Sequence, residues 1–144
     1  MFKHILIATD GSEVATKAVT GGLTLAKNLA ARVVVMTASE PFPAMVSAET
    51  IAANFPEEYE KASAASAARI LGEVREEALT MGVECETSHV TNFVAEAIIQ
   101  TAKAKACDLI VMGSHGRRGI ARLLLGSQAT KVVTLSPVPV LIYR

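Results

Sequence analysis

The clearest indication of the fold is the stretch Leu109-Ile-Val-Met-Gly-Ser-His-Gly-Arg-Arg-Gly-Ile-Ala-Arg-Leu-Leu-Leu-Gly-Ser127. It begins with four apolar residues that are typical of a buried strand, and then becomes rich in glycine and arginine. The part from Gly113 to Ser127 holds four of the nine glycines in the chain. A glycine-rich turn that leads from a strand into a helix presents backbone N–H groups to an anion. The sequence therefore predicts an anion-binding turn at this point.

The length and composition indicate one globular domain. We expect residues 1–144 to form a single domain, and 51% of them are apolar. The formal net charge is zero, which argues against a dedicated nucleic-acid-binding protein. Residues 40–86 nevertheless carry ten acidic residues, whereas the chain after Asp108 contains Lys and Arg but no Asp or Glu. Because these bases accompany the glycine-rich turn, a small anion is a better candidate ligand than a polymer.

The cysteines and histidines do not predict a metal site. Cys85 and Cys107 lack the spacing of metal ligands and indicate small buried side chains in a reducing compartment. His4 and His89 have no partner at ligand spacing. The apolar runs are too short to span a membrane, and we expect no secretory signal. We therefore expect a soluble, cytoplasmic protein without a membrane partner.

Apolar segments alternate with helical patterns along the chain. The predicted strands cover residues 4–9, 32–37, 83–89, 107–112 and 138–143. The predicted helices cover residues 13–30, 56–81, 93–105 and 127–135, with a short helical turn at 47–53 in a long irregular connection. This alternation predicts a three-layer α/β fold, in which helices cover both faces of an open parallel five-stranded sheet.

Several residues predict where the helices begin, end and touch the sheet. Ser12, Asn92 and Ser127 each stand just before a helical pattern, where a side-chain oxygen caps the first turn. Gly82 stands where a helix ends, because glycine adopts the left-handed conformation of a C-terminal cap. The pair Gly21-Gly22 lies inside the first helix at a cost in helix propensity, and we interpret it as a close contact between helix and sheet.

The last apolar segment predicts an edge strand and a homodimer. Pro139 lies within this segment, and proline cannot donate a hydrogen bond to a neighbouring strand. An apolar edge needs a cover, and the simplest cover is the same strand of a second copy. We expect the homodimer to form through Val138, Val140 and Ile142. The alternative is a solitary edge that its prolines protect.

Two turns with polar or flexible residues follow predicted strands. They are Asp10-Gly11-Ser12 and the segment from Gly113 to Ser127. In open α/β sheets, ligands bind at the carboxyl ends of strands where the winding reverses direction. The second turn has the spacing Gly-x2-Gly-x9-Gly-Ser rather than the common phosphate-binding signatures. This spacing favours phosphate binding, and the alternative is a surface loop with flexible turns.

The chain resembles the universal stress protein family over nearly all of its length. The resemblance rests on residues 5–12 (ILIATDGS), 106–116 (ACDLIVMGSHG), 125–127 (LGS) and 137–142 (PVPVLI). The Gly-x2-Gly-x9-Gly-Ser spacing looks like the branch of the family that binds ATP. The resemblance implies a Rossmann-like fold of the adenine nucleotide alpha hydrolase type, with strand order three-two-one-four-five. That order would place the Asp10 turn and the Gly113 turn side by side.

The resemblance also implies roles at the adenosine end of a nucleotide. Asp10 would meet the ribose and the adenosine side, while Thr9 and Ala38 would flank the adenine. Met112 and Gly113 would pass their backbone along the ribose and the α-phosphate. The expected ligand is ATP or AMP.

At the other end, the resemblance implies that Gly116, Gly126, Ser127 and the amide of Gln128 hold the phosphates. A magnesium or manganese ion could arrive with the phosphates. Relatives often have a glycine and a proline before the third long helix, where this chain has Asn92 and Val94. This difference falls at residues 89–94, which are expected to form a wall near the ligand.

Three functions follow from this reading of the sequence. The first is a dimeric regulatory module of a stress response that binds an adenine nucleotide. The second is a slow ATPase or phosphotransferase, but Asp10 is the one acid expected near the ligand, so we assign no catalytic residue. The third is an interaction dimer that binds no nucleotide.

Three further polar residues of the glycine-rich turn are not assigned to the ligand. Arg117 and Arg118 are interpreted as solvated loop charges rather than phosphate ligands, and His115 as an exposed side chain.

Overall fold

A computed structural model describes residues 1–43, 45, 47–116 and 125–144 of the chain. Strands and helices alternate along it, as the sequence predicts. In chain order the elements are β1 (His4–Ala8), α1 (Glu13–Leu29), β2 (Arg32–Ser39), α2 (Ala48–Ala52), α3 (Phe55–Met81), β3 (Cys85–Thr91), α4 (Val94–Ala104), β4 (Leu109–Gly113), α5 (Ser127–Leu135) and β5 (Val140–Tyr143).

The strands form one parallel sheet in the order β3-β2-β1-β4-β5. This is the predicted order. In the central strand β1, Ile5 is paired with Val33 of β2 on one side and with Leu109 of β4 on the other. The chain therefore winds away from β1 in two directions, and the carboxyl ends of β1 and β4 lie side by side at the reversal.

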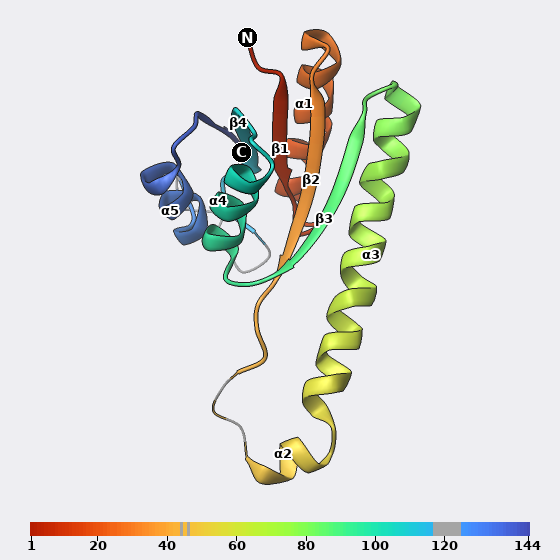
Figure 1. Cartoon of the computed structure of the whole chain (residues 1–144), viewed down its shortest axis with the longest axis vertical. Helices are drawn as coiled ribbons and strands as arrows, with labels where there is room; N and C mark the ends of the chain where they lie inside the picture. The colour runs from red at the N-terminus through yellow and green to blue at the C-terminus, as the bar shows by residue number, and fades with distance from the viewer. Residues whose placement is uncertain (44, 46, 117–124) are drawn as a thin grey trace.

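Helices cover both faces of the sheet, which confirms the three-layer prediction (Figure 1). Ile5, Ile7 and Val35 pack on the side of α1 and α3, whereas Leu6 and Met36 pack on the side of α4 and α5. Successive side chains of a strand point to opposite faces, so a strand that is covered twice must be apolar throughout. This requirement explains why β1 is buried at all five positions.

Gly21 and Gly22 bring α1 close to the sheet, as the sequence predicts. A Cβ atom at Gly22 would lie 2.7 Å from Ile7 Cδ1, and one at Gly21 would overlap the ring of Tyr143 in β5. Both positions therefore leave no room for a side chain. Glycine lowers the helix propensity of α1, but its lack of a side chain allows this close contact.

The helix ends agree with the sequence predictions at two positions and differ at two others. Ser12 caps α1 by accepting the Ala15 N–H at 3.3 Å, and Gly82 ends α3 with φ of +73°. Ser127 was wrongly predicted as a cap, because Gly126 is the N-cap of α5 and its carbonyl already accepts the Thr130 N–H at 3.0 Å. Ser127 is instead the first helical residue.

Asn92 was also wrongly predicted as a helix cap. The N-cap of α4 is Phe93, which makes no side-chain cap bond. Asn92 Oδ1 accepts the Phe93 N–H at 2.8 Å, outside the helix. Its short side chain satisfies the adjacent backbone N–H and therefore does not serve the first helical turn.

The final strand occupies a sheet edge, as predicted, but it is shorter than predicted. β5 begins at Val140, so Val138 and Pro139 lie before it. The carbonyl of Pro139 accepts the Ile110 N–H at 3.0 Å, a bond that needs no donor from the proline. The proline thus marks the entry to the edge strand rather than its interior.

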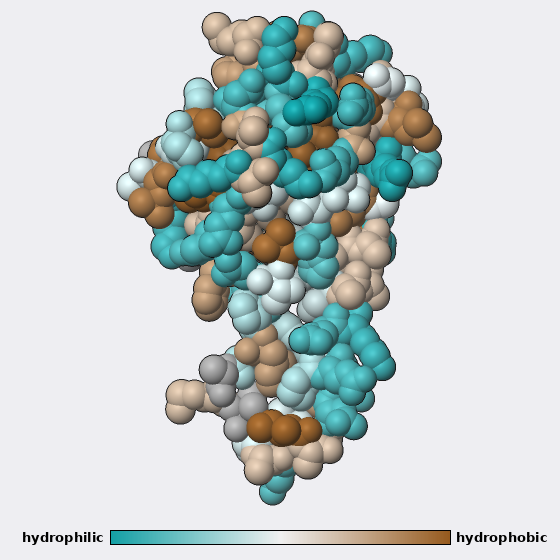
Figure 2. Space-filling model, viewed as in Figure 1, coloured by the Kyte–Doolittle hydropathy of each residue, from teal (hydrophilic) through white to brown (hydrophobic). Residues whose placement is uncertain are grey.

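α2 and the first turns of α3 extend beyond the carboxyl edge of the sheet (Figure 1). The expected helical turn at 47–53 is α2. Tyr59 in α3 donates its hydroxyl to the Glu40 carbonyl at 2.8 Å and packs edge-on against Phe42. Figure 2 shows apolar side chains on this extension, where Ile51 and Phe55 are exposed. In the part of the chain that the structure describes, no helix combines the length and apolar character needed to cross a membrane.

Candidate functional site

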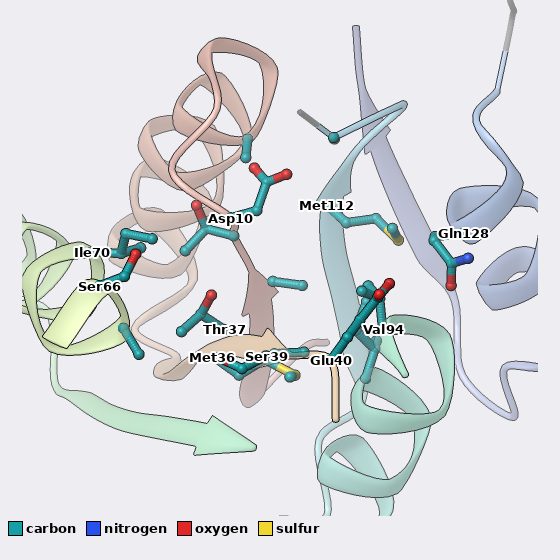
Figure 3. A pocket seen from close by; sticks show the side chains of 18 of the residues that line it. Asp10, Met36, Thr37, Ser39, Glu40, Ser66, Ile70, Val94, Met112 and Gln128 are labelled. Atoms are coloured by element: carbon teal, nitrogen blue, oxygen red, sulfur yellow. The ribbon is translucent and has the colours of Figure 1, made fainter. Parts of the chain in front are cut away.

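A cavity of about 570 Å³ lies at the carboxyl ends of β1, β2 and β4 (Figure 3). α3 lines it on one side, and α4 and α5 line it on the other. This volume is in the range of small-molecule binding sites. All nine residues that the sequence analysis selected line this cavity: Thr9, Asp10, Ala38, Met112, Gly113, Gly116, Gly126, Ser127 and Gln128.

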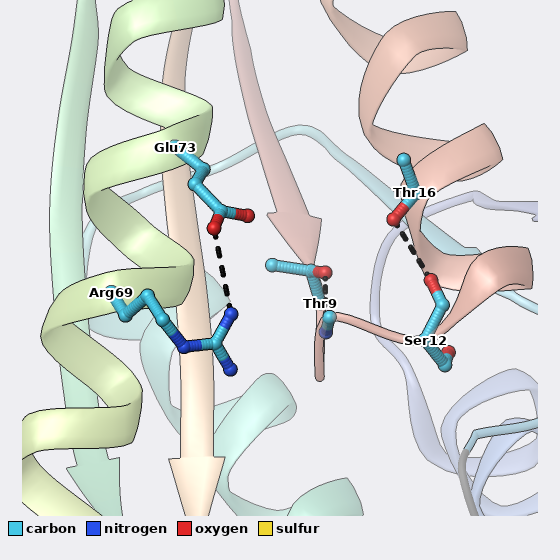
Figure 4. A network of polar contacts seen from close by, with 6 residues as sticks. Thr9, Ser12, Thr16, Arg69 and Glu73 are labelled. Atoms are coloured by element: carbon cyan, nitrogen blue, oxygen red, sulfur yellow. Dashed lines mark hydrogen bonds and ion pairs between the residues drawn. The ribbon is translucent and has the colours of Figure 1, made fainter.

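The turn after β1 is held together by its own side chains. Thr9 Oγ1 accepts the Gly11 N–H at 3.1 Å, and Asp10 Oδ1 accepts the Ser12 N–H at 2.9 Å. The Ser12 carbonyl accepts the Thr16 hydroxyl at 2.9 Å, which ties the turn to α1 (Figure 4). Asp10 therefore shapes the turn with one carboxylate oxygen, and its orientation in the cavity is fixed by the backbone.

The turn after β4 meets the turn after β1 through glycine. A Cβ atom at Gly116 would lie 2.5 Å from Asp10 Oδ2, so the carboxylate occupies the place of a side chain. At the far end, the Gly126 N–H donates to the Ser114 carbonyl at 2.6 Å. A Cβ at Gly126 would lie 3.2 Å from that carbonyl. Close approach, rather than a positive φ, is what selects glycine at both positions.

The side chain of Gln128 joins the two helices on the other side of the cavity. Its Oε1 atom accepts the Ala95 N–H at 3.1 Å, in the first turn of α4. Because Phe93 makes no side-chain cap bond, this contact satisfies an N–H group that the helix itself leaves open. Gln128 therefore caps α4 from α5. From the sequence, only the amide of Gln128 was expected to contribute, as a phosphate ligand.

The wall that α3 contributes was not predicted from the sequence. Residues of α3 and of the end of β2 line the cavity beside those predicted: Thr37, Ser39, Glu40, Tyr59, Ala62, Ser63, Ser66, Ala67 and Ile70. The α3 residues recur at spacings of three and four, with small side chains at most positions. That pattern marks one face of a helix, and it was the signal that could have identified this wall.

Charge at the cavity comes from carboxylates in the described part of the chain. Asp10 and Glu40 are the acidic lining residues, and no Lys or Arg lines the cavity among the described residues. His115, which was interpreted as an exposed side chain, is half-buried and also lines the cavity, with Nδ1 3.1 Å from Ser114 Oγ. Arg117 and Arg118, which were interpreted as loop charges, lie outside the described residues. Within the described ranges, no three His, Cys, Asp or Glu side chains form a group that could hold a metal.

The two thiols take no part in this cavity. Cys107 precedes β4 and Cys85 begins β3, so both lie at the amino ends of strands, away from the carboxyl edge. Burial raises the pKa of Cys107 to about 11 and also raises the pKa of Cys85. Both thiols are therefore protonated at neutral pH, in keeping with the packing role that the sequence analysis expected.

The fold defines an open α/β protein, and its cavity lies at the switch point of the sheet. The family model for the universal stress protein family matches residues 1–144. The chain belongs to this family. A curated relative, the universal stress protein YxiE of Bacillus subtilis, is 33% identical over 148 residues, and the alignment covers 100% of both chains.

Two solved structures show the same fold. The universal stress protein UspA from Lactobacillus plantarum superposes with a TM-score of 0.89 at 23% identity, covering 99% of this chain and 98% of that one. A universal stress protein crystallised in complex with cAMP superposes with a TM-score of 0.72 at 27% identity, covering 99% and 97%.

Proposed function

We propose that this protein binds ATP or another adenine nucleotide in the cavity at the carboxyl edge of the sheet. One observation carries the proposal: the Asp10 turn and the glycine-rich turn meet there, with the Gly116 backbone against the Asp10 carboxylate. A cavity that combines a carboxylate with closely approached backbone suits a ribose joined to phosphates. The related protein crystallised with cAMP supports an adenine nucleotide as the ligand class.

In this proposal the adenosine binds at the ends of the central strands. Asp10 bonds the ribose, Thr9 and Ala38 flank the adenine, and the backbone of Met112 and Gly113 follows the ribose and the α-phosphate. Asp10 suits its role because its Oδ1 atom is already fixed by the Ser12 N–H. A carboxylate held in this way contacts ribose hydroxyls without having to be ordered by the ligand.

The phosphates bind between the glycine-rich turn and the start of α5. Gly116 and Gly126 allow close approach, and the first N–H groups of α5, at Ser127 and Gln128, point toward an anion. The macrodipole of α5 adds a partial positive charge at that end. A magnesium or manganese ion accompanies the phosphates if one is required for their charge.

We further propose that the protein acts as a dimeric regulatory module of a cytoplasmic stress response. The edge strand β5 offers unpaired backbone groups to a second copy, together with Val138, Val140 and Ile142, which pack partly on the core. Leu141 on the same strand is 37% exposed. Sedimentation of wild type and Leu141→Lys is the measurement: a dimer that the variant dissociates is expected, and a monomeric wild type would contradict the dimer.

The alternative function is slow ATP hydrolysis or phosphoryl transfer in the same cavity. Glu40 favours it to a small extent, because it gives the cavity a second carboxylate that the sequence analysis did not foresee. A steady-state ATPase assay separates the two functions. Turnover well above background that Asp10→Ala abolishes would favour the enzyme.

Calorimetric titration with ATP tests nucleotide binding directly. Wild type is expected to bind, and Gly126→Asp is expected to lose binding, because it adds a negative charge beside the phosphates. The melting temperature of Gly126→Asp serves as the folding control. No heat and no thermal shift with wild type at millimolar ATP would refute the proposal, leaving an interaction dimer that binds no nucleotide.

A further inference from the structure

The corner between α2 and α3 projects beyond the carboxyl edge of the sheet, at one end of the molecule (Figure 1). Ser47 caps α2, because its side chain accepts the Thr50 N–H at 3.2 Å. Asn54 turns the chain with φ of +59°, a left-handed conformation that asparagine tolerates. The Asn54 carbonyl accepts the Glu58 N–H at 3.0 Å, in the first turn of α3. The corner is therefore a folded element that presents a preformed surface.

Two large apolar side chains are exposed at this corner (Figure 2). Ile51 in α2 is 57% exposed, and Phe55 at the start of α3 is 50% exposed. None of the residues of α2, all of which the structure describes, is buried. A helix this short is not stable in water through its own hydrogen bonds, and its exposed apolar side chains gain free energy when a partner covers them. Exposed apolar side chains on such a projecting element indicate a contact site.

The charge at this corner is negative. The chain contains no Lys or Arg between Arg32 and Lys61. Lys61 Nζ lies 3.6 Å from Glu57 Oε1, so this base is already paired. We define the corner surface as the exposed side chains of Ile51, Phe55, Glu49, Glu57, Glu58 and Glu60. It combines apolar side chains with an excess of carboxylates.

The negative charge decides which kind of partner fits. A second copy across a two-fold axis would bring the same acidic side chains opposite one another, and like charges repel. Nucleic acids and anionic lipid surfaces are repelled for the same reason. A basic protein segment is attracted, and the long apolar stems of lysine and arginine add to its contact with apolar side chains. Charge complementarity therefore favours a basic, amphipathic partner.

We propose that the corner surface binds a basic amphipathic helix of a partner protein. The apolar face of that helix contacts Ile51 and Phe55, and its lysine and arginine side chains meet the flanking carboxylates. Ile51 and Phe55 are not among the residues that line the cavity. The inference therefore goes beyond nucleotide binding and does not depend on it.

Fluorescence anisotropy with a labelled synthetic peptide tests the corner surface. The probe is a peptide of about 15 residues, with leucine on one face of its helix and lysine on the other. Wild type is expected to bind it. Ile51→Ser and Phe55→Ser are each expected to weaken binding at least about tenfold, because truncation of a central apolar side chain removes much of the binding energy of an interface. Leu79→Ser is the matched control, since Leu79 is 73% exposed near the other end of α3, and it is expected to bind like wild type.

Two charge variants separate the local charge from the net charge. Glu60→Lys and Glu76→Lys both replace an exposed acid of α3 and change the net charge equally, but only Glu60 belongs to the corner surface. The two positions lie about 24 Å apart along the helix, which exceeds the range of about 10 Å over which exposed charges interact at 0.1 M salt. Glu60→Lys is expected to weaken peptide binding about three- to tenfold, and Glu76→Lys to leave it nearly unchanged. Equal weakening in both variants would overturn the proposal, since the peptide would then respond to net charge alone.

Other results would also overturn the proposal. A wild type that does not bind the peptide, or serine variants at 51 and 55 that bind it like wild type, would show that the corner surface is not a docking site. Equal binding of a peptide with glutamate in place of lysine would show that charge plays no part. Self-association of wild type in sedimentation that Phe55→Ser abolishes would assign the surface to a second copy.

Calorimetry with ATP keeps this inference distinct from the proposed function. Phe55→Ser is expected to bind ATP like wild type, because Phe55 does not line the cavity. Loss of ATP binding in this variant would overturn the corner surface as a separate site. A wild type that binds the peptide but not ATP would refute the proposed function and leave the inference intact.

Discussion

The carboxylate of Asp10 and the backbone of Gly116 are in contact, so that a Cβ atom at position 116 would lie 2.5 Å from Asp10 Oδ2. These residues are far apart in the sequence and follow the adjacent strands β1 and β4. The parallel sheet brings their turns together. The candidate ligand site depends on this approach, because it sets the distance between the carboxylate and the glycine-rich turn.

Substituting Gly116 is therefore expected to disturb the site more than the fold. Gly116→Ala forces the Asp10 carboxylate or the turn to move, and we expect ATP binding to weaken at least about tenfold, since misplacing a ligand contact is costly. Gly72→Ala is the matched control, because a Cβ there meets nothing within 4 Å. Titration calorimetry compares the two. An alanine at 116 that binds ATP like the control would show that the contact does not matter for binding.

Gly22 is expected to be required for packing rather than for binding. A Cβ at Gly22 would lie 2.7 Å from Ile7 Cδ1, and Ile7 is fully buried and cannot move away freely. Gly22→Ala should therefore lower the free energy of unfolding by about 1–3 kcal/mol, although alanine favours the helix. Gly72→Ala should raise it by up to about 1 kcal/mol. Urea denaturation measures both, and a stabilising alanine at position 22 would contradict the packing argument.

Gln128 is expected to stabilise α4 through its side chain. Gln128→Ala removes the acceptor of the Ala95 N–H, and the loss should cost about 0.5–2 kcal/mol of unfolding free energy, as for other helix caps. Gln128→Glu keeps an acceptor at the same place and should retain the stability. The added charge should nevertheless weaken ATP binding if the phosphates lie near the start of α5. Equal losses of stability in both variants would argue against the cap.

The stability of the protein is expected to decrease as the pH falls from about 7.5 to about 5.5. Burial, assisted by the nearby Arg32, lowers the pKa of His4 below 6.5, while a hydrogen bond with the Lys105 backbone and the charges of Asp108 and Glu86 partly oppose this shift. His4 Nδ1 is buried without a partner. The unfolded chain therefore binds a proton at a higher pH than the folded protein, and acid favours unfolding through this window.

The melting temperature measured across this pH range checks the assignment to His4. In His4→Leu, the decrease over this window should be clearly smaller than in wild type. The carboxylates Glu86 and Glu96 have lowered pKa values and act only at a lower pH, so they do not contribute to the same window. An unchanged pH profile in His4→Leu would assign the effect to another group.

Local patterns predicted the elements and the two turns of the candidate site, whereas the family resemblance supplied Thr9, Ala38, Met112 and Gln128. Apolar runs identified the strands, because a strand covered on both faces has no polar position. The predictions that Ser12 begins a helix and Gly82 ends one are confirmed, because a capping residue interacts with residues only three or four positions away. The predicted caps Ser127 and Asn92 were wrong by one residue. A neighbouring carbonyl closes the first turn of α5, and a side chain from another helix caps the first turn of α4.

The strands, the helices and the glycine-rich turn could be predicted from the amino-acid sequence, because they depend on the periodicity and conformational freedom of neighbouring residues. Family resemblance supplied the strand order, which the structure confirms. The folded chain was needed to show that Gly116 lies against Asp10, that Gln128 caps α4, and that residues of α3 line the same cavity as the two turns. Those contacts join residues distant in the chain, and no local signal encodes which side chain fills the space beside another.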